Sequence, residues 1–222
     1  MNYLLLFLAV AVGYVVALFL KKKELRNMEV FLAFSGAFLL SVTVFELLPA
    51  VFENPSKKIG VYIMMGIMLQ IFLEFFSKGA EHGHVHLHAE NKHFPWILFI
   101  SLGIHAFMEG FPISEENNLL VAIIVHKIPV AIILSFFFIT AGYRNSTTLI
   151  FLFLFALMTP LGNFLGTHYE LANSYETEIS AVVIGIFLHV STTILFESSK
   201  NHKFNLSKMS AVIIGIIIAY FL

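Results

Sequence analysis

The sequence at residues 118–140, NLLVAIIVHKIPVAIILSFFFIT, decides the fold class of this chain. Lys127 is the one residue in it that carries a full charge at neutral pH. An α-helix rises about 1.5 Å per residue, so about 20 apolar residues cross the roughly 30 Å hydrocarbon core of a bilayer. The stretch therefore predicts a membrane-spanning helix, and similar stretches recur along the whole chain.

The composition of the 222 residues is that of a membrane protein, because 59% are hydrophobic and only 12% are charged. The net charge of -1 leaves no extended basic surface, which excludes nucleic acid as a partner. Cysteine is absent, so neither disulfides nor thiolate metal sites can form. Any metal must therefore bind nitrogen and oxygen ligands.

Eight apolar stretches are long enough, or nearly so, to span a bilayer as helices. They lie at residues 3–20, 30–51, 59–77, 95–114, 118–140, 147–167, 179–197 and 207–222. The ten-residue alternation of a membrane barrel is missing. We therefore predict an all-α, polytopic membrane bundle of eight transmembrane helices. It forms a single domain over residues 1–222, with a His-rich loop at about 79–94.

Lysine and arginine are unevenly divided between the two sides of the predicted bundle. Ten lie in the first, third, fifth and seventh loops, and only Lys57 and Lys58 lie on the opposite side. Because cytoplasmic loops carry the excess of positive charge, we predict a cytoplasmic His-rich loop and both termini outside the cytoplasm. We expect a multi-pass protein in the lipid bilayer of the plasma (cell inner) membrane.

Three candidate metal ligands lie at mid-membrane depth on the fourth and fifth predicted spans. His105 precedes Glu116 in the connecting loop by 11 residues and His126 follows it by 10, so both imidazoles lie about 15 Å from that loop. Glu109 follows His105 by four residues and shares its helix face. Imidazole and carboxylate groups suit Zn²⁺, Fe²⁺, Mn²⁺ or Co²⁺. The structural alternative is a set of hydrogen bonds between helices.

Lys127 needs an anionic partner at this depth, and Glu109 is the expected one. Pro129 interrupts the backbone hydrogen bonds nearby, where carbonyl groups can line a cavity. The alternative is a lysine and a glutamate that only neutralise each other.

Further polar residues on the predicted spans are candidates for an ion pathway. Gln70, Thr159 and His189 lie near mid-depth, although His189 could equally donate a hydrogen bond between helices. Glu46 lies toward the outer end of its span, where it lines an entrance or reaches headgroup water. The third loop has a composition typical of adaptable metal binding, with the alternating residues His82, His84, His86 and His88.

The fourth and fifth spans resemble the ZIP (Zrt/Irt-like) family of divalent metal transporters. Residues 101–110, SLGIHAFMEG, are similar to the family's fourth-span signature, His-x-x-x-acidic-Gly, and residues 126–129, HKIP, to its fifth-span His-x-x-Pro. The resemblance implies transport of Zn²⁺, or of Fe²⁺, Mn²⁺, Co²⁺ or Cd²⁺, into the cytoplasm by alternating access, with these spans moving relative to a scaffold. The ion is then the substrate, and no tightly bound cofactor is expected. A homodimer is also implied, and the small residues Gly36 and Ala37 are compatible with one.

The chain departs from the family pattern at several positions. Ala106 follows the first histidine where many members have asparagine, Glu46 replaces a second-span histidine, and Val130 stands where an acidic residue often bridges two ions. A two-metal site is therefore not expected, and Lys127 is predicted to replace the second cation. One ion is then held by His105, Glu109 and His126.

The main alternative function is an intramembrane zinc-dependent hydrolase, in which buried histidine and glutamate activate water. The chain lacks His-Glu-x-x-His, and Glu109 already serves as a ligand, which leaves no separate general base. We therefore predict a protein that is not an enzyme. A metal sensor or a structural membrane protein, either of which would bind metal without flux, is the third alternative.

Overall fold

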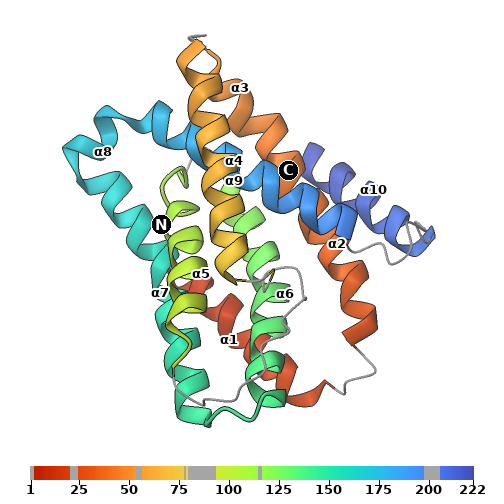
Figure 1. Ribbon diagram of the computed structural model, residues 1–222. Coiled ribbons are helices and arrows are strands. Elements are labelled where there is room, and N and C mark those ends of the chain that lie inside the picture. Colours follow the sequence, from red (N-terminus) through yellow and green to blue (C-terminus); the bar gives the residue numbers. More distant parts are fainter. Residues whose placement is uncertain are drawn as a thin grey trace.

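The computed structural model describes residues 3–20, 25–53, 57–77, 79, 94–114, 117–197 and 206–222. All regular elements in those ranges are helices, which confirms the predicted all-α class (Figure 1). They are α1 Tyr3–Phe19, α2 Leu25–Val42, η1 Thr43–Leu47, α3 Leu48–Val51, α4 Lys57–Ser77, α5 Trp96–Met108, α6 Leu119–Thr140, α7 Asn145–His168, α8 Glu170–Ser174, α9 Glu176–Glu197 and α10 Leu206–Tyr220. The loop histidines His82, His84, His86 and His88 lie outside the described residues.

In the part of the chain that the structure describes, five helical segments are long and apolar enough to cross a membrane. One is Met28–Val51, which runs through α2, η1 and α3, and the others lie in α4, α6, α7 and α9. Three more helices, α1, α5 and α10, are apolar but shorter, with 17, 13 and 15 residues. The chain is thus a multi-pass membrane protein, and the count of eight spans stays a prediction.

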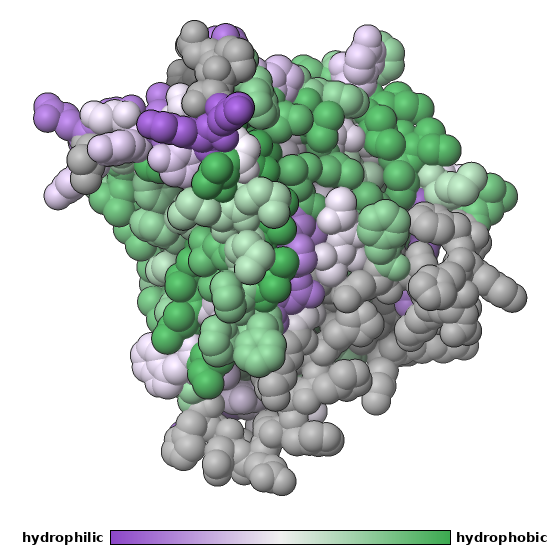
Figure 2. Space-filling model, turned by 45° about the horizontal axis from the view of Figure 1, so that its top comes forward, coloured by the Kyte–Doolittle hydropathy of each residue, from purple (hydrophilic) through white to green (hydrophobic). Residues whose placement is uncertain are grey.

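The outer surface of the helices is strongly apolar. Hydrophobic residues cover most of the coloured face in Figure 2. Large side chains such as Phe75 and Phe153 are 75% and 59% exposed. Because soluble monomers rarely expose apolar patches beyond a few hundred Å², this surface is suited to contact with lipid.

Proline and glycine residues explain two departures of the helices from regular membrane spans. Pro49 has no N–H to donate to the carbonyl four residues earlier, and the chain forms the π-helical turn η1 in the residues just before it. The fourth predicted span, residues 95–114, is helical only as far as Met108. Gly110 favours termination of the helix, and Pro112 disfavours helical geometry at the residue before it.

The helices pack in two groups. In one group α1 contacts α6 and α7, and α5 contacts α7. In the other, α9 contacts α2 and α4, and α10 contacts α2. Contacts of α4 with α5 and of α2 with α6 join the two groups. The predicted metal ligands on α5 and α6 therefore lie where the groups meet.

Glycine permits the closest helix contact in the second group. A Cβ atom added at Gly66 in α4 would lie 1.9 Å from the Val182 carbonyl oxygen, and one at Gly185 in α9 would lie 2.0 Å from the Ile63 oxygen. Only glycine allows two backbones to approach so closely.

The small residues considered for a dimer surface pack inside the chain. Gly36 faces Ile194 of α9. A Cβ atom added at Gly36 would lie 2.9 Å from Cγ2 of Ile194. Ala37 is only 1% exposed. These residues thus serve intrachain packing, and dimerisation stays a prediction.

Candidate metal site at the junction of α5, α6 and α7

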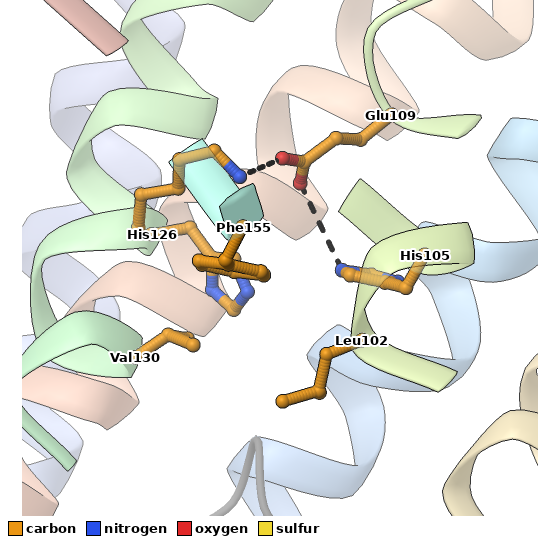
Figure 3. Close-up of a pocket in the computed structure, with 7 residues that line it drawn as sticks. Leu102, His105, Glu109, His126, Val130 and Phe155 are labelled. Carbon is orange, nitrogen blue, oxygen red and sulfur yellow. Dashed lines mark hydrogen bonds and ion pairs between the residues drawn. The ribbon is translucent and has the colours of Figure 1, made fainter. Parts of the chain in front are cut away.

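A small buried cavity lies between α5, α6 and α7 (Figure 3). Its volume of about 10 Å³ is close to the room that one water molecule needs. The residues that line it are Leu102, His105, Glu109, His126, Lys127, Val130 and Phe155. The structure therefore brings the three predicted ligands and the predicted lysine around one space.

The two imidazoles lie close together, as the sequence predicted. His105 is 3% exposed and His126 is 2% exposed. Their ring centres are 6.5 Å apart, and the ring planes meet edge-on at 68°. Figure 3 shows both rings at the rim of the cavity, one from α5 and one from α6.

Glu109 connects the other polar side chains of the cavity. Its backbone N–H donates to the His105 carbonyl at 3.1 Å, which continues the geometry of α5 for one more residue. Its Oε1 accepts hydrogen bonds from the Lys127 ammonium and, at 2.6 Å, from the Thr159 hydroxyl. Its Oε2 lies 3.7 Å from His105 Nε2. Glu109 is thus the partner of Lys127, as the sequence predicted.

Lys127 is buried with its charge satisfied on two sides. The side chain is 2% exposed and pairs with Glu109, which is 1% exposed. Its Nζ also lies 4.7 Å from the centre of the Phe155 ring, within cation–π range. A buried ammonium without such partners would be strongly unfavourable.

Two further predicted residues hold this site from neighbouring helices. Gln70 in α4 is fully buried, and its Oε1 lies 3.1 Å from His105 Nδ1. Thr159 in α7 is also fully buried, and its hydroxyl lies 2.8 Å from the Ala106 carbonyl as well as beside Glu109.

The remaining candidates lie elsewhere. Both carboxylate oxygens of Glu46 accept hydrogen bonds from Asn118, one from the backbone N–H at 2.8 Å and one from the side-chain amide at 2.9 Å. Glu46 therefore caps the start of α6. His189 Nε2 contacts Glu74 Oε2 at 2.5 Å, which links α9 to α4. Neither Glu46 nor His189 lines the cavity.

The family model described as "ZIP Zinc transporter" matches residues 80–222. The chain belongs to the ZIP zinc transporter family. All seven residues that line the cavity fall inside the matched range.

This ZIP chain is similar to two characterised proteins. Protein zntD of Dictyostelium discoideum is 28% identical over 150 residues, which cover 58% of this chain and 22% of that protein. Zinc transporter ZIP1 of Danio rerio is 24% identical over 123 residues, which cover 50% of this chain and 41% of that protein. The alignments thus span less than half of either relative.

The cavity of this ZIP chain is not a preformed metal shell. Within the described residues, no group of three His, Asp or Glu side chains is arranged to hold a metal ion. Glu109 Oε1 is already engaged by Lys127 and Thr159. A cation that enters must compete with the lysine or use Oε2.

Sequence reasoning missed Phe155 and Glu74. Phe155 contacts the ammonium of Lys127, but an aromatic residue within an apolar helix carries no signal of such a role. The contact of Glu74 with His189 depends on how α4 packs on α9, which the sequence does not reveal.

Proposed function

We propose that this ZIP-family chain transports divalent metal cations, with Zn²⁺ as the main substrate, across the membrane into the cytoplasm. One observation carries the proposal: His105 Nε2 and Glu109 Oε2 face each other 3.7 Å apart at a buried cavity that His126 also lines. The name of the Danio rerio relative, a zinc transporter, favours zinc.

The separation of these two atoms is close to what zinc requires. With bonds of about 2.0–2.2 Å, two ligands of a tetrahedral zinc ion lie about 3.4 Å apart. The gap of 3.7 Å between Nε2 and Oε2 needs only a small side-chain adjustment to match. His126 from α6 supplies the third ligand in this proposal, and water supplies the fourth.

Lys127 limits the site to one transported ion in this proposal. Its ammonium contacts Glu109 Oε1 and carries the positive charge that a second metal would otherwise bring. The single ion is then bound from the side of Oε2, between α5 and α6.

The proposed transport also requires a complete transmembrane bundle. We propose that the three shorter apolar helices α1, α5 and α10 cross the bilayer with the five longer segments, as one domain of eight spans over residues 1–222. The lysine and arginine distribution supports both termini outside the cytoplasm of a plasma (cell inner) membrane protein. A homodimer remains a prediction from the family.

Uptake into proteoliposomes tests the proposal. Zn²⁺, Fe²⁺ and Mn²⁺ are compared as competing substrates for the wild type, His105→Ala and the control His168→Ala, whose side chain is exposed on α7. We expect zinc flux in the wild type and the control, and a loss of at least tenfold in His105→Ala. Equal flux in all three proteins would remove His105 from the mechanism. Metal binding without flux would favour a sensor.

A further inference from the structure

Gln70 is a buried residue on α4, and its side-chain amide contacts His105 of the candidate metal site. Its side chain has no exposed surface, in a helix that is otherwise mostly apolar. A buried amide is costly unless it is hydrogen-bonded. The Oε1 atom of Gln70 lies 3.1 Å from Nδ1 of His105, within the range of a hydrogen bond.

This contact determines which ring nitrogen of His105 carries the proton. An amide oxygen only accepts hydrogen bonds, so Nδ1 must donate and must be protonated. The competing tautomer would place the proton on Nε2, toward Glu109. That contact is 3.7 Å long, which is too long for a hydrogen bond. The Gln70 contact therefore favours the tautomer with Nδ1–H.

The consequence appears on the other side of the ring. With the proton on Nδ1, Nε2 presents a lone pair toward the cavity and toward Glu109 Oε2. Two acceptor atoms then face each other with no proton between them, which is the arrangement that a cation stabilises. The opposite tautomer would block Nε2 as a ligand.

We propose that Gln70 is a positioning residue that holds His105 in the tautomer able to bind the metal. The inference rests on the proposed function of the cavity and adds a role for a residue outside the metal shell. Partners of this kind fix the ring orientation of a ligating histidine and raise its basicity.

The position of Gln70 gives this contact a second consequence. Gln70 belongs to α4, which packs on α9, whereas His105 belongs to α5, which packs on α7. The hydrogen bond thus crosses the contact of α4 with α5, which joins the two helix groups. Metal affinity at His105 is therefore tied to the relative position of the two groups.

Nitrogen NMR of metal-free protein labelled with ¹⁵N-histidine tests the proposal directly. At about pH 8, above the range in which imidazole normally takes up a second proton, the two ring nitrogens report which one is protonated. The His105 signal is identified by its absence in His105→Ala. We expect protonated Nδ1 in the wild type, and a mixture or the other tautomer in Gln70→Met, which has a similar shape and no acceptor oxygen.

Matched variants separate this role from packing. Gln70→Glu restores an acceptor oxygen and is expected to keep Nδ1 protonated. Leu73→Met changes another buried residue of α4 and is expected to leave the signal unchanged. Zinc binding by calorimetry is expected to weaken about tenfold in Gln70→Met and not in Leu73→Met.

The outcomes separate the two proposals. A wild type protonated at Nε2, or an unchanged tautomer in Gln70→Met, overturns the role of Gln70. The spectra need neither metal nor transport. An altered tautomer in Gln70→Met, together with wild-type protein that moves no zinc, would therefore support the Gln70 contact and reject the proposed function.

Discussion

The ammonium of Lys127 and the carboxylate of Glu109 form a buried ion pair between α6 and the end of α5, and their side chains are only 2% and 1% exposed. The pair neutralises two groups that would each be unfavourable alone in this environment. It also places a fixed positive charge beside the atoms proposed to bind a transported cation.

Replacement of this charge should change the number of bound ions. In Lys127→Asp a carboxylate faces Glu109, and two adjacent carboxylates favour a cation between them. We expect the zinc stoichiometry to rise from about one to about two ions per chain, measured by elemental analysis of purified protein. Lys208→Met is the control, because Lys208 pairs with Glu29 away from the cavity. An unchanged stoichiometry in Lys127→Asp would count against Lys127 as a substitute for a second cation.

Removal of the Thr159 hydroxyl should weaken the site without a large loss of volume. Thr159→Val loses the donor to Glu109 Oε1, a charge-assisted hydrogen bond that contributes about 1.5–3 kcal/mol. We expect a higher zinc concentration at half-maximal uptake and a lower melting temperature in detergent, with recovery in Thr159→Ser. Thr148→Val on the same helix is the control, because the buried Thr148 hydroxyl donates to the local Arg144 carbonyl, at 3.4 Å, and does not line the cavity. Equal effects of the two valine variants would contradict the role of Thr159.

Close packing of α5 against α7 should depend on Gly162. A Cβ atom there would lie 1.9 Å from the Phe107 carbonyl oxygen, so alanine must push the two backbones apart. We expect Gly162→Ala to destabilise the fold by about 1–3 kcal/mol and to reduce zinc uptake, because Thr159 moves away from Glu109. Gly60→Ala has open space at its added Cβ and should be neutral or slightly stabilising. Thermal unfolding in detergent and uptake measure both effects, and a stable, active Gly162→Ala would refute the packing argument.

Glu46 has either a structural role at the start of α6 or a role at the entrance of the ion pathway. Its two hydrogen bonds to Asn118 place a negative charge at the N-terminus of α6, where it stabilises the helix. We expect Glu46→Gln to lower stability by about 1 kcal/mol and to leave zinc stoichiometry unchanged, with Glu53→Gln as the control, because Glu53 is exposed just beyond the end of α3. Unaltered thermal stability combined with lost uptake would instead support the entrance role.

Much of the site could be predicted because spacing along a helix determines depth in a membrane. His105 and His126 lie at similar distances from the loop that joins their spans, so their meeting at one level follows from helix geometry. The pairing of Lys127 with Glu109 follows from the cost of an isolated charge in an apolar interior. The helix ends were less predictable, because α5 stops at Met108 and η1 forms near Pro49 for reasons of local backbone geometry.

The sequence by itself determined the all-α membrane class and predicted that His105 and His126 lie near each other, because the length of an apolar stretch and the rise of a helix are both measured along the chain. Only the tertiary structure decided which side chains meet across helices. It brought four pairs of side chains into contact: Gln70 with His105, Phe155 with Lys127, Glu46 with Asn118, and Glu74 with His189. Those contacts depend on how each helix is rotated about its axis and on which helix it packs against, and glycine contacts such as Gly162 on Phe107 set how closely helices approach.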